Sequence, residues 1–334
     1  MARMTKFDFT IPAILVISLL TLAPLASAGC SCSAGIWDPS GFLNTDLGSS
    51  QPTQPIQPAQ GSKDSATTGS SNPQSAPDRL ASYPNGSIMK SMKSVSSSDV
   101  VIDASNGNSY ATSHIKNAIH IPSNDLLDSN GNLKSDEDIS RLLGEAGLSR
   151  EDSVVVYSRT ERSGEAELAF LVLRHLGQED VKLLDGSLED WKDAGLPIES
   201  QETIIPAVLY NPSVKPDVIA EYDYVRSGQA QIVDARPFVD FGKGRIPGSI
   251  ALDPANVIKG DKIKNGYELA TVFSRLEKDV PIVVYSDDYS RSALVAYSLQ
   301  LMDYEAAIYS WKDWQAHESK ADAADSKYVK LGKT

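Results

Sequence analysis

The sequence predicts an α/β protein built from two tandem domains, each with a central, mostly parallel sheet flanked by helices on both faces. Three observations predict this fold class. Strand-like runs alternate with helical stretches, the strand-like runs are β-branched without polar alternation, and the whole pattern occurs twice. Strands of that composition are buried on both faces, as they are in parallel sheets. The length of 334 residues corresponds to about two domains once both ends of the chain are set aside.

The first element in the chain is a targeting signal, predicted over residues 1–28. Arg3 and Lys6 give it a positive start, residues 14–22 form an apolar core, and residues 26–28 read Ala-Ser-Ala, an A-x-A cleavage pattern. The apolar run is short for a permanent membrane span, so cleavage is preferred over an uncleaved anchor. No later segment is long and apolar enough to span a bilayer, so we expect the rest of the chain to be exported and soluble.

The only two cysteines, Cys30 and Cys32, follow this signal directly. The sequence Ala28-Gly29-Cys30 resembles the end of a bacterial or archaeal lipobox, although Ser27 stands where an aliphatic residue is usual. We therefore expect Cys30 to carry a lipid anchor that places the protein on the outer face of the membrane or the cell surface. Ordinary cleavage after Ala28, giving a secreted or periplasmic protein, is the alternative. Two cysteines one residue apart make no complete metal site, and we predict no metal and no cofactor.

Residues 29–80 are predicted to form a polar tether. From about Ser33 onward they are rich in Ser, Gln, Pro, Gly and Thr, a composition that cannot bury enough apolar surface to fold. A chain of about 50 such residues spans about 40 Å, which suits a domain held at a membrane. The net charge of −13 argues against nucleic acid as a partner and against adhesion to anionic lipid headgroups.

Two copies of one unit follow, predicted as domain 1 over residues 81–202 and domain 2 over residues 217–320. In each copy a β-branched run, VVVY or IVVY, ends in a serine and is followed by a short polar loop and an apolar-periodic helix. A connection with three prolines, residues 203–216, is predicted to be the linker between the domains. A polar tail over residues 321–334 completes the chain.

The order of motifs in the two copies resembles that of rhodanese domains. The stretch VDARPFVDFGKGRIPGSIALD resembles the family's D-x-R and G-H-I-P-G-A-I signature, and the serine-containing loops stand where the family has its catalytic-cysteine loop. The segments YSWKDW and DGSLEDWKDAGLPIE resemble the family's closing segment. The resemblance covers about residues 88–317, twice. It implies a thiosulfate or 3-mercaptopyruvate sulfurtransferase, in which a loop cysteine carries sulfane sulfur as a persulfide.

At that cysteine position this chain has Ser158 in domain 1 and Ser286 in domain 2. An environment that lowers the pKa of a thiol into the neutral range leaves an alcohol protonated, and a serine oxygen cannot carry a stable sulfane sulfur. Serine hydrolysis is also disfavoured, because the chain offers only four histidines as a general base and has no G-x-S-x-G elbow. We therefore predict no catalytic residue and a binding or regulatory role. Sulfur transfer through Cys32 or an external thiol is the alternative, and a surface protein without a specific ligand is a third hypothesis.

The two loops differ in charge, and loop 1 is one residue shorter. Loop 1 contains Ser158, Arg159, Thr160, Glu161 and Arg162 before Ser163, and loop 2 contains Ser286, Asp287, Asp288, Tyr289, Ser290 and Arg291 before Ser292. Two arginines against one glutamate make loop 1 the better candidate for holding sulfate, phosphate or a carboxylate. Two aspartates against one arginine oppose anion binding at loop 2. The alternative for both serines is that they only cap the junction between loop and helix.

Three further residues are expected to support these loops. Asp234 and Arg236 stand at the family's D-x-R positions in domain 2, and the resemblance implies that they form a buried ion pair. Domain 1 has the corresponding aspartate, Asp103, but Ser105 stands at the arginine position. Domain 1 therefore departs from the family pattern at two positions, and domain 2 at one.

Overall fold

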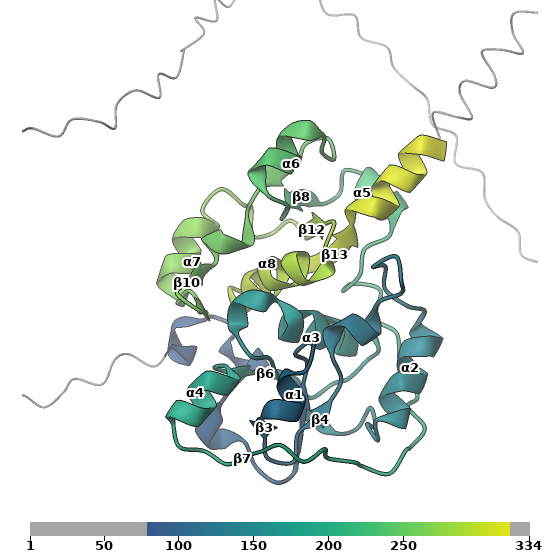
Figure 1. Ribbon diagram of the computed structural model, residues 1–334. Helices are drawn as coiled ribbons and strands as arrows, with labels where there is room; N and C mark the ends of the chain where they lie inside the picture. Colours follow the sequence, from purple (N-terminus) through teal and green to yellow (C-terminus); the bar gives the residue numbers. More distant parts are fainter. Residues whose placement is uncertain (1–78, 321–334) are drawn as a thin grey trace, which may run out of the picture. The chain divides into compact units, whose positions relative to one another are not determined.

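The computed structural model describes residues 79–320 of the chain. These residues form two parallel sheets with helices on both faces, which confirms the predicted fold class (Figure 1). The predicted signal, Cys30 and the tail over residues 321–334 lie outside the described residues, as does the predicted tether up to residue 78. Within residues 79–320, no helix is long and apolar enough to cross a membrane.

The sheet of domain 1 is parallel throughout, in the strand order β1-β6-β5-β2-β4. Its strands are β1 (Met89–Ser91), β2 (Asp99–Asp103), β4 (Ile119–His120), β5 (Ser153–Tyr157) and β6 (Val181–Asp185). A small antiparallel pair joins β3 (His114–Ile115) to β7 (Ile198–Glu199). The helices are α1 (Ser109–Thr112), α2 (Asp136–Glu145), α3 (Glu165–His175) and α4 (Leu188–Asp193), with 3-10 turns at Leu80–Ser82, Gly86–Ile88, Met92–Ser94, Ser123–Leu126 and Glu161–Ser163.

Alternate residues of the central strand β5 face opposite layers of the domain. Val154 and Val156 belong to the core that includes α2 and α3, whereas Val155 packs in a second cluster with Leu188 and Trp191 of α4. Successive strand residues point to opposite faces of a sheet. Because both faces are covered, every position of the run must be apolar, which is why VVVY has no polar alternation.

Domain 2 repeats this order in the sheet β13-β12-β8-β9, again with parallel neighbours. Its strands are β8 (Gln231–Asp234), β9 (Ile250–Ala251), β12 (Ile282–Ser286) and β13 (Ala306–Ser310), and the antiparallel hairpin is β10 (Ile258–Lys259) with β11 (Lys262–Ile263). The helices are α5 (Tyr222–Arg226), α6 (Phe238–Lys243), α7 (Gly266–Val272) and α8 (Tyr289–Leu301), with a 3-10 turn at Pro254–Asn256 and a helical stretch over residues 311–320. The residues of the predicted linker, 203–216, contain neither helix nor strand.

The helices α3 and α8, which follow the two serine loops, pack against each other and join the halves into one apolar core. The rings of Phe170 and Tyr297 meet edge to face at 5.0 Å. At the start of α3, Gly164 has a φ of +74° and lies so close to Ser290 that an added Cβ would overlap the carbonyl oxygen of Ser290. Both a positive φ and a close approach of two backbones favour glycine. The end of loop 1 therefore lies against loop 2.

Candidate functional site

The two serines of the predicted site lie at equivalent places in the two sheets. Ser158 follows β5 directly and Ser286 is the last residue of β12. Each strand is central in its sheet, between β6 and β2 in one case and between β13 and β8 in the other. The carboxyl ends of parallel strands are where open α/β sheets place their sites. Both serines are nonetheless buried, with 3% and 2% of their surface exposed.

The hydroxyl of Ser158 is held within its own loop. It donates to the carbonyl oxygen of Thr160 at 3.0 Å and lies 3.4 Å from the hydroxyl of Ser163. Ser163 donates to the same carbonyl at 2.9 Å. Loop 1 is thus a compact turn in which both hydroxyls point at one acceptor.

The hydroxyl of Ser286 is bonded differently, to carboxylate and backbone groups of loop 2. It donates to a side-chain oxygen of Asp287 at 3.1 Å and accepts from the backbone N–H of Asp288 at 3.3 Å. Asp288 in turn caps α8, because its side chain accepts from the N–H of Ser290 at 2.9 Å. Neither serine has a histidine as a hydrogen-bond partner within residues 79–320, so neither loop, as the structure describes it, forms the serine–histidine pair of a serine hydrolase.

The two arginines of loop 1 are already paired with carboxylates from elsewhere in the fold. A guanidinium nitrogen of Arg159 lies 3.1 Å from a carboxylate oxygen of Glu189 on α4. A guanidinium nitrogen of Arg162 lies 3.3 Å from a carboxylate oxygen of Asp261 in the turn of the β10–β11 hairpin. In both pairs each side chain is about half exposed or more, so the pairs are weak and exchangeable. Glu189 and Asp261 therefore offset the two positive charges of loop 1.

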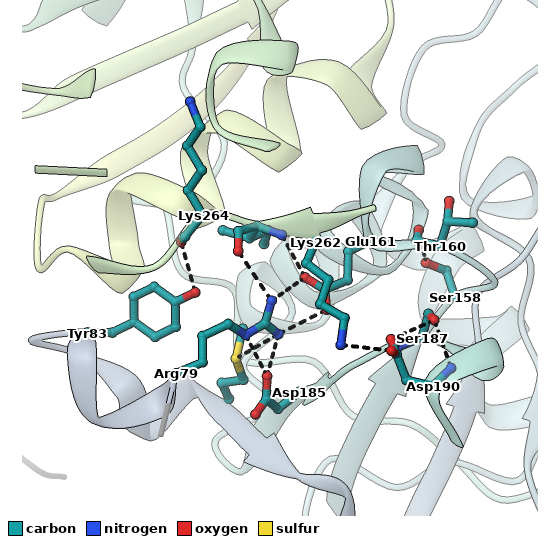
Figure 2. A network of polar contacts seen from close by, with 12 residues as sticks. Arg79, Tyr83, Ser158, Thr160, Glu161, Asp185, Ser187, Asp190, Lys262 and Lys264 are labelled. Atoms are coloured by element: carbon teal, nitrogen blue, oxygen red, sulfur yellow. Dashed lines mark hydrogen bonds and ion pairs between the residues drawn. The ribbon is translucent and has the colours of Figure 1, made fainter. Parts of the chain in front are cut away.

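The single glutamate of loop 1 points the opposite way, into the protein. Glu161 is 6% exposed. Its carboxylate accepts two hydrogen bonds of 2.9 Å from the guanidinium of Arg79 and one of 2.8 Å from the N–H of Ile263 on β11 (Figure 2). Arg79 also donates to Asp185 at the end of β6, with its Nε 2.8 Å from the carboxylate. Loop 1 is therefore connected to the first described residue of the chain and to domain 2.

Loop 2 borders a cavity of about 760 Å³ through Tyr289. Residues from both halves line it, among them His175, Tyr309, Ser310 and His317. Burial raises the pKa of Tyr289 to about 12, so its phenol is neutral at physiological pH. Arg291, the cation of loop 2, donates to the carbonyl oxygen of Ala235 at 3.2 Å.

The D-x-R residues of domain 2 form a buried ion pair. Arg236 and Asp234 are 4% and 0% exposed, and the guanidinium donates to both carboxylate oxygens, at 2.9 Å from Nε and 2.6 Å from a terminal nitrogen. The same nitrogen reaches the carbonyl oxygen of Gly244 at 2.6 Å, and the guanidinium lies 3.9 Å from the ring centre of Trp311. The carboxylate also accepts from the phenol of Tyr285.

Domain 1 satisfies the corresponding aspartate without a guanidinium. The carboxylate of Asp103 accepts from the phenol of Tyr157 at 2.8 Å and from the N–H of Ser105 at 2.9 Å. The Ser105 side chain turns toward loop 1, where it accepts from the N–H of Arg159 at 2.9 Å. The Ser105 hydroxyl therefore does not bind Asp103, whose side-chain partner is the phenol of Tyr157. The hydroxyl binds the backbone of loop 1 instead.

The sequence analysis did not identify the residues outside the loops that bind the two buried aspartates and Glu161. Tyr157 and Tyr285 end apolar strand runs and therefore look like ordinary core residues. Arg79 lies inside the predicted tether, and the β10–β11 hairpin has no strong strand signal. Within the part of the chain that the structure describes, no group of three or more His, Cys, Asp or Glu side chains is placed to hold a metal ion.

The comparisons with known proteins agree with the geometry. The rhodanese-like domain family matches residues 88–194 and 222–317. A 3-mercaptopyruvate sulfurtransferase of Escherichia coli is 25% identical over 231 residues, which covers 62% of this chain and 82% of that protein. The sulfur carrier protein TtuD of Thermus thermophilus is 25% identical over 211 residues, covering 54% and 74%.

Among solved structures, the 3-mercaptopyruvate sulfurtransferase SseA of Escherichia coli has a similar fold. It superposes with a TM-score of 0.60 at 22% identity, over 67% of this chain and 98% of that one. The family match takes in both sheets and both serine loops, once in each half. The chain belongs to the rhodanese-like domain family and carries two copies of that domain.

Proposed function

We propose that this rhodanese-family protein is catalytically degenerate and acts as an exported, lipid-anchored binding or regulatory module. The observation that carries the proposal is the serine at the end of the central strand in both domains. A sulfurtransferase of this family needs a thiolate there to accept and hold sulfane sulfur. Ser158 and Ser286 are alcohols, and residues 79–320 contain no cysteine.

The surroundings of the two hydroxyls support this proposal. Each hydroxyl is buried and donates to an acceptor in its own loop. Two neighbouring aspartates in loop 2 oppose the development of negative charge on Ser286, because like charges raise the cost of ionisation. A hydroxyl in that setting stays protonated and hydrogen-bonded.

The ligand site that we propose is loop 1, and its ligand is a small anion such as sulfate, phosphate or a carboxylate. Arg159 and Arg162 are exposed at the loop, and their ion pairs with Glu189 and Asp261 are exchangeable. An incoming anion that displaces Glu189 or Asp261 would gain charge-assisted hydrogen bonds from the same guanidinium groups.

A sulfurtransferase is the second candidate, favoured by the names of the relatives, which include 3-mercaptopyruvate and thiosulfate sulfurtransferases. It would need a thiol that the two loops do not provide. Cys32 is available only if the segment before domain 1 reaches a loop, and a lipid on Cys30 would hold Cys32 at the membrane.

Thiosulfate-to-cyanide sulfur transfer by the purified full chain separates the two candidates. The comparison uses the natural protein, its Ser158→Cys and Ser286→Cys variants, and a Cys30→Ser/Cys32→Ser control that removes every thiol. We expect no turnover from the natural protein and measurable turnover from a cysteine variant. Turnover by the natural protein that persists in the thiol-free control would overturn the proposal, and turnover that disappears in the control would assign the activity to the N-terminal cysteines.

Intact-mass measurement of the protein from the membrane fraction tests the anchor. We expect a mass increased by a diacylglycerol group, and its loss in a Cys30→Ser variant. An unmodified mass beginning after residue 28 would replace the anchor with a secreted or periplasmic form.

A further inference from the structure

Arg79 connects three separate parts of the protein behind loop 1 (Figure 2). Its guanidinium binds Glu161 of loop 1 through two nitrogens, each at 2.9 Å. It binds Asp185 at the end of β6, and it donates to the carbonyl oxygen of Ile263 on the domain-2 hairpin at 3.2 Å. Its side chain is 18% exposed, so this network is largely shielded from water.

Glu161 depends on Arg79 for its charge partner. Its other partner is the neutral N–H of Ile263, and no second cation lies within ion-pair distance of it among residues 79–320. Removing one member of a buried ion pair leaves an uncompensated charge, which is strongly unfavourable. Without Arg79, the Glu161 carboxylate is therefore more stable turned out to water, a movement that carries loop 1 with it.

The hairpin of domain 2 closes over loop 1 through the same network. Its backbone binds both Glu161 and Arg79 at Ile263. Its side chains add two exposed ion pairs, Asp261 with Arg162 at 3.3 Å and Lys262 with Asp190 at 2.7 Å. In this arrangement Asp261 pairs with Arg162, one of the two arginines that an anion at loop 1 would bind.

We propose that Arg79 is a latch: it holds Glu161 inward and the β10–β11 hairpin against loop 1, and its release frees Arg162 of the anion site from Asp261. This inference rests on the proposed function of loop 1 as the ligand site. Loss of the guanidinium frees Glu161, loosens the hairpin at Ile263 and separates Asp261 from Arg162.

Amide hydrogen exchange on the full chain tests the latch. In an Arg79→Met variant we expect exchange to be at least about tenfold faster in residues 159–163 and 258–264, with the strands of the two parallel sheets unchanged. An Arg79→Met/Glu161→Gln variant removes both charges and keeps an acceptor for the N–H of Ile263, so protection there should return. Arg141→Met, which removes an exposed arginine paired within α2, is the matched control.

Three outcomes of this exchange experiment overturn the latch. They are unchanged exchange in Arg79→Met, equal acceleration throughout the chain, and no recovery in the double variant. If Arg79→Met does not fold, Arg79→Lys provides the same readout, because it keeps one cation and loses the two-nitrogen contact. Local acceleration with Arg79→Lys, again absent in Arg141→Met, supports the latch.

Sulfate titration at constant ionic strength, followed by the amide signals of loop 1 in the full chain, tests what the latch controls. We expect sulfate to bind Arg79→Met about two- to fivefold more tightly than it binds the natural protein, since Asp261, whose exposed pair with Arg162 is weak, no longer competes for that arginine. Faster exchange without sulfate binding in any variant would leave the latch standing and refute loop 1 as the anion site. Equal sulfate affinity in both proteins would refute the control of binding by Arg79.

Discussion

Glu167 on α3 is predicted to make the free energy of unfolding fall as the pH rises from about 5 to 8. Its side chain faces the core shared by the two halves and is 1% exposed, and one of its carboxyl oxygens has no hydrogen-bond partner among the described residues. Burial raises the pKa of Glu167 from an ordinary 4.5 to about 8. The nearby Glu161 and Glu165 act in the same direction and Arg79 opposes them. Burial, followed by the nearby Glu167, raises the pKa of Tyr297 on α8.

The size of the effect follows from proton linkage. Between the unfolded pKa of 4.5 and the folded pKa of about 8, the folded protein holds a proton on Glu167 that the unfolded chain releases. Each pH unit in that window lowers the free energy of unfolding by about 1.4 kcal/mol. The stabilisation is fully present below about pH 4.5 and is lost as the pH passes 8, a total of about 5 kcal/mol.

Urea unfolding at pH 5, 6, 7 and 8 measures this term when the natural protein is compared with a Glu167→Gln variant. Glutamine has nearly the same shape as glutamate and cannot ionise. Between pH 5 and pH 8 the free energy of unfolding of the natural protein should therefore fall by about 4 kcal/mol relative to that of the variant. Glu145→Gln on the exposed side of α2 is the control and should leave the pH dependence unchanged. Parallel pH curves for the natural protein and Glu167→Gln would refute the reasoning.

Three further substitutions test individual contacts. Arg236→Met leaves Asp234 buried without its cation and should lower the free energy of unfolding, measured with urea, by about 3–5 kcal/mol. A loss below about 1 kcal/mol would mean that the hydrogen bonds from the Tyr285 phenol and the backbone suffice for Asp234. Gly164→Ala places a Cβ against the carbonyl of Ser290 at a φ of +74° and should cost more than about 1 kcal/mol, seen as a lower Tm, whereas an unchanged Tm would contradict the close approach. Ser187→Ala removes the capping box at the start of α4 and should cost about 1 kcal/mol in urea unfolding; no loss would show that the cap contributes nothing.

The sequence was sufficient to predict the sheets because burial on both faces leaves a direct mark on composition. Val154, Val155 and Val156 are apolar in succession because α3 covers one face of β5 and α4 the other. The repeat then placed Ser158 and Ser286 at equivalent strand ends. These features depend on residues close together in the chain, where pattern and structure correspond closely.

Contacts between distant residues left no comparable mark. Glu161 and Arg79 are 82 positions apart, and the Glu161 carboxylate reaches Ile263 over 102 positions. A single charge in a loop does not show whether it faces water or the protein, and Arg79 follows a polar stretch typical of a tether. Loop 1 has two arginines and one glutamate in its sequence, but Glu189 and Asp261, which belong to other elements, pair with the two arginines.

The two domains stabilise the same buried aspartate in different ways, and the difference bears on which loop can respond to a ligand. In domain 2 a guanidinium binds Asp234, the carbonyl of Gly244 and the ring of Trp311 at once, so loop 2 rests on a fully buried charge pair. In domain 1 neutral hydrogen bonds suffice for Asp103, and Arg159 and Arg162 of loop 1 lie in ion pairs that water reaches. Buried pairs are costly to break and exposed pairs exchange readily. Loop 1 is therefore the loop whose exposed ion pairs a small anion can exchange without breaking a buried charge pair.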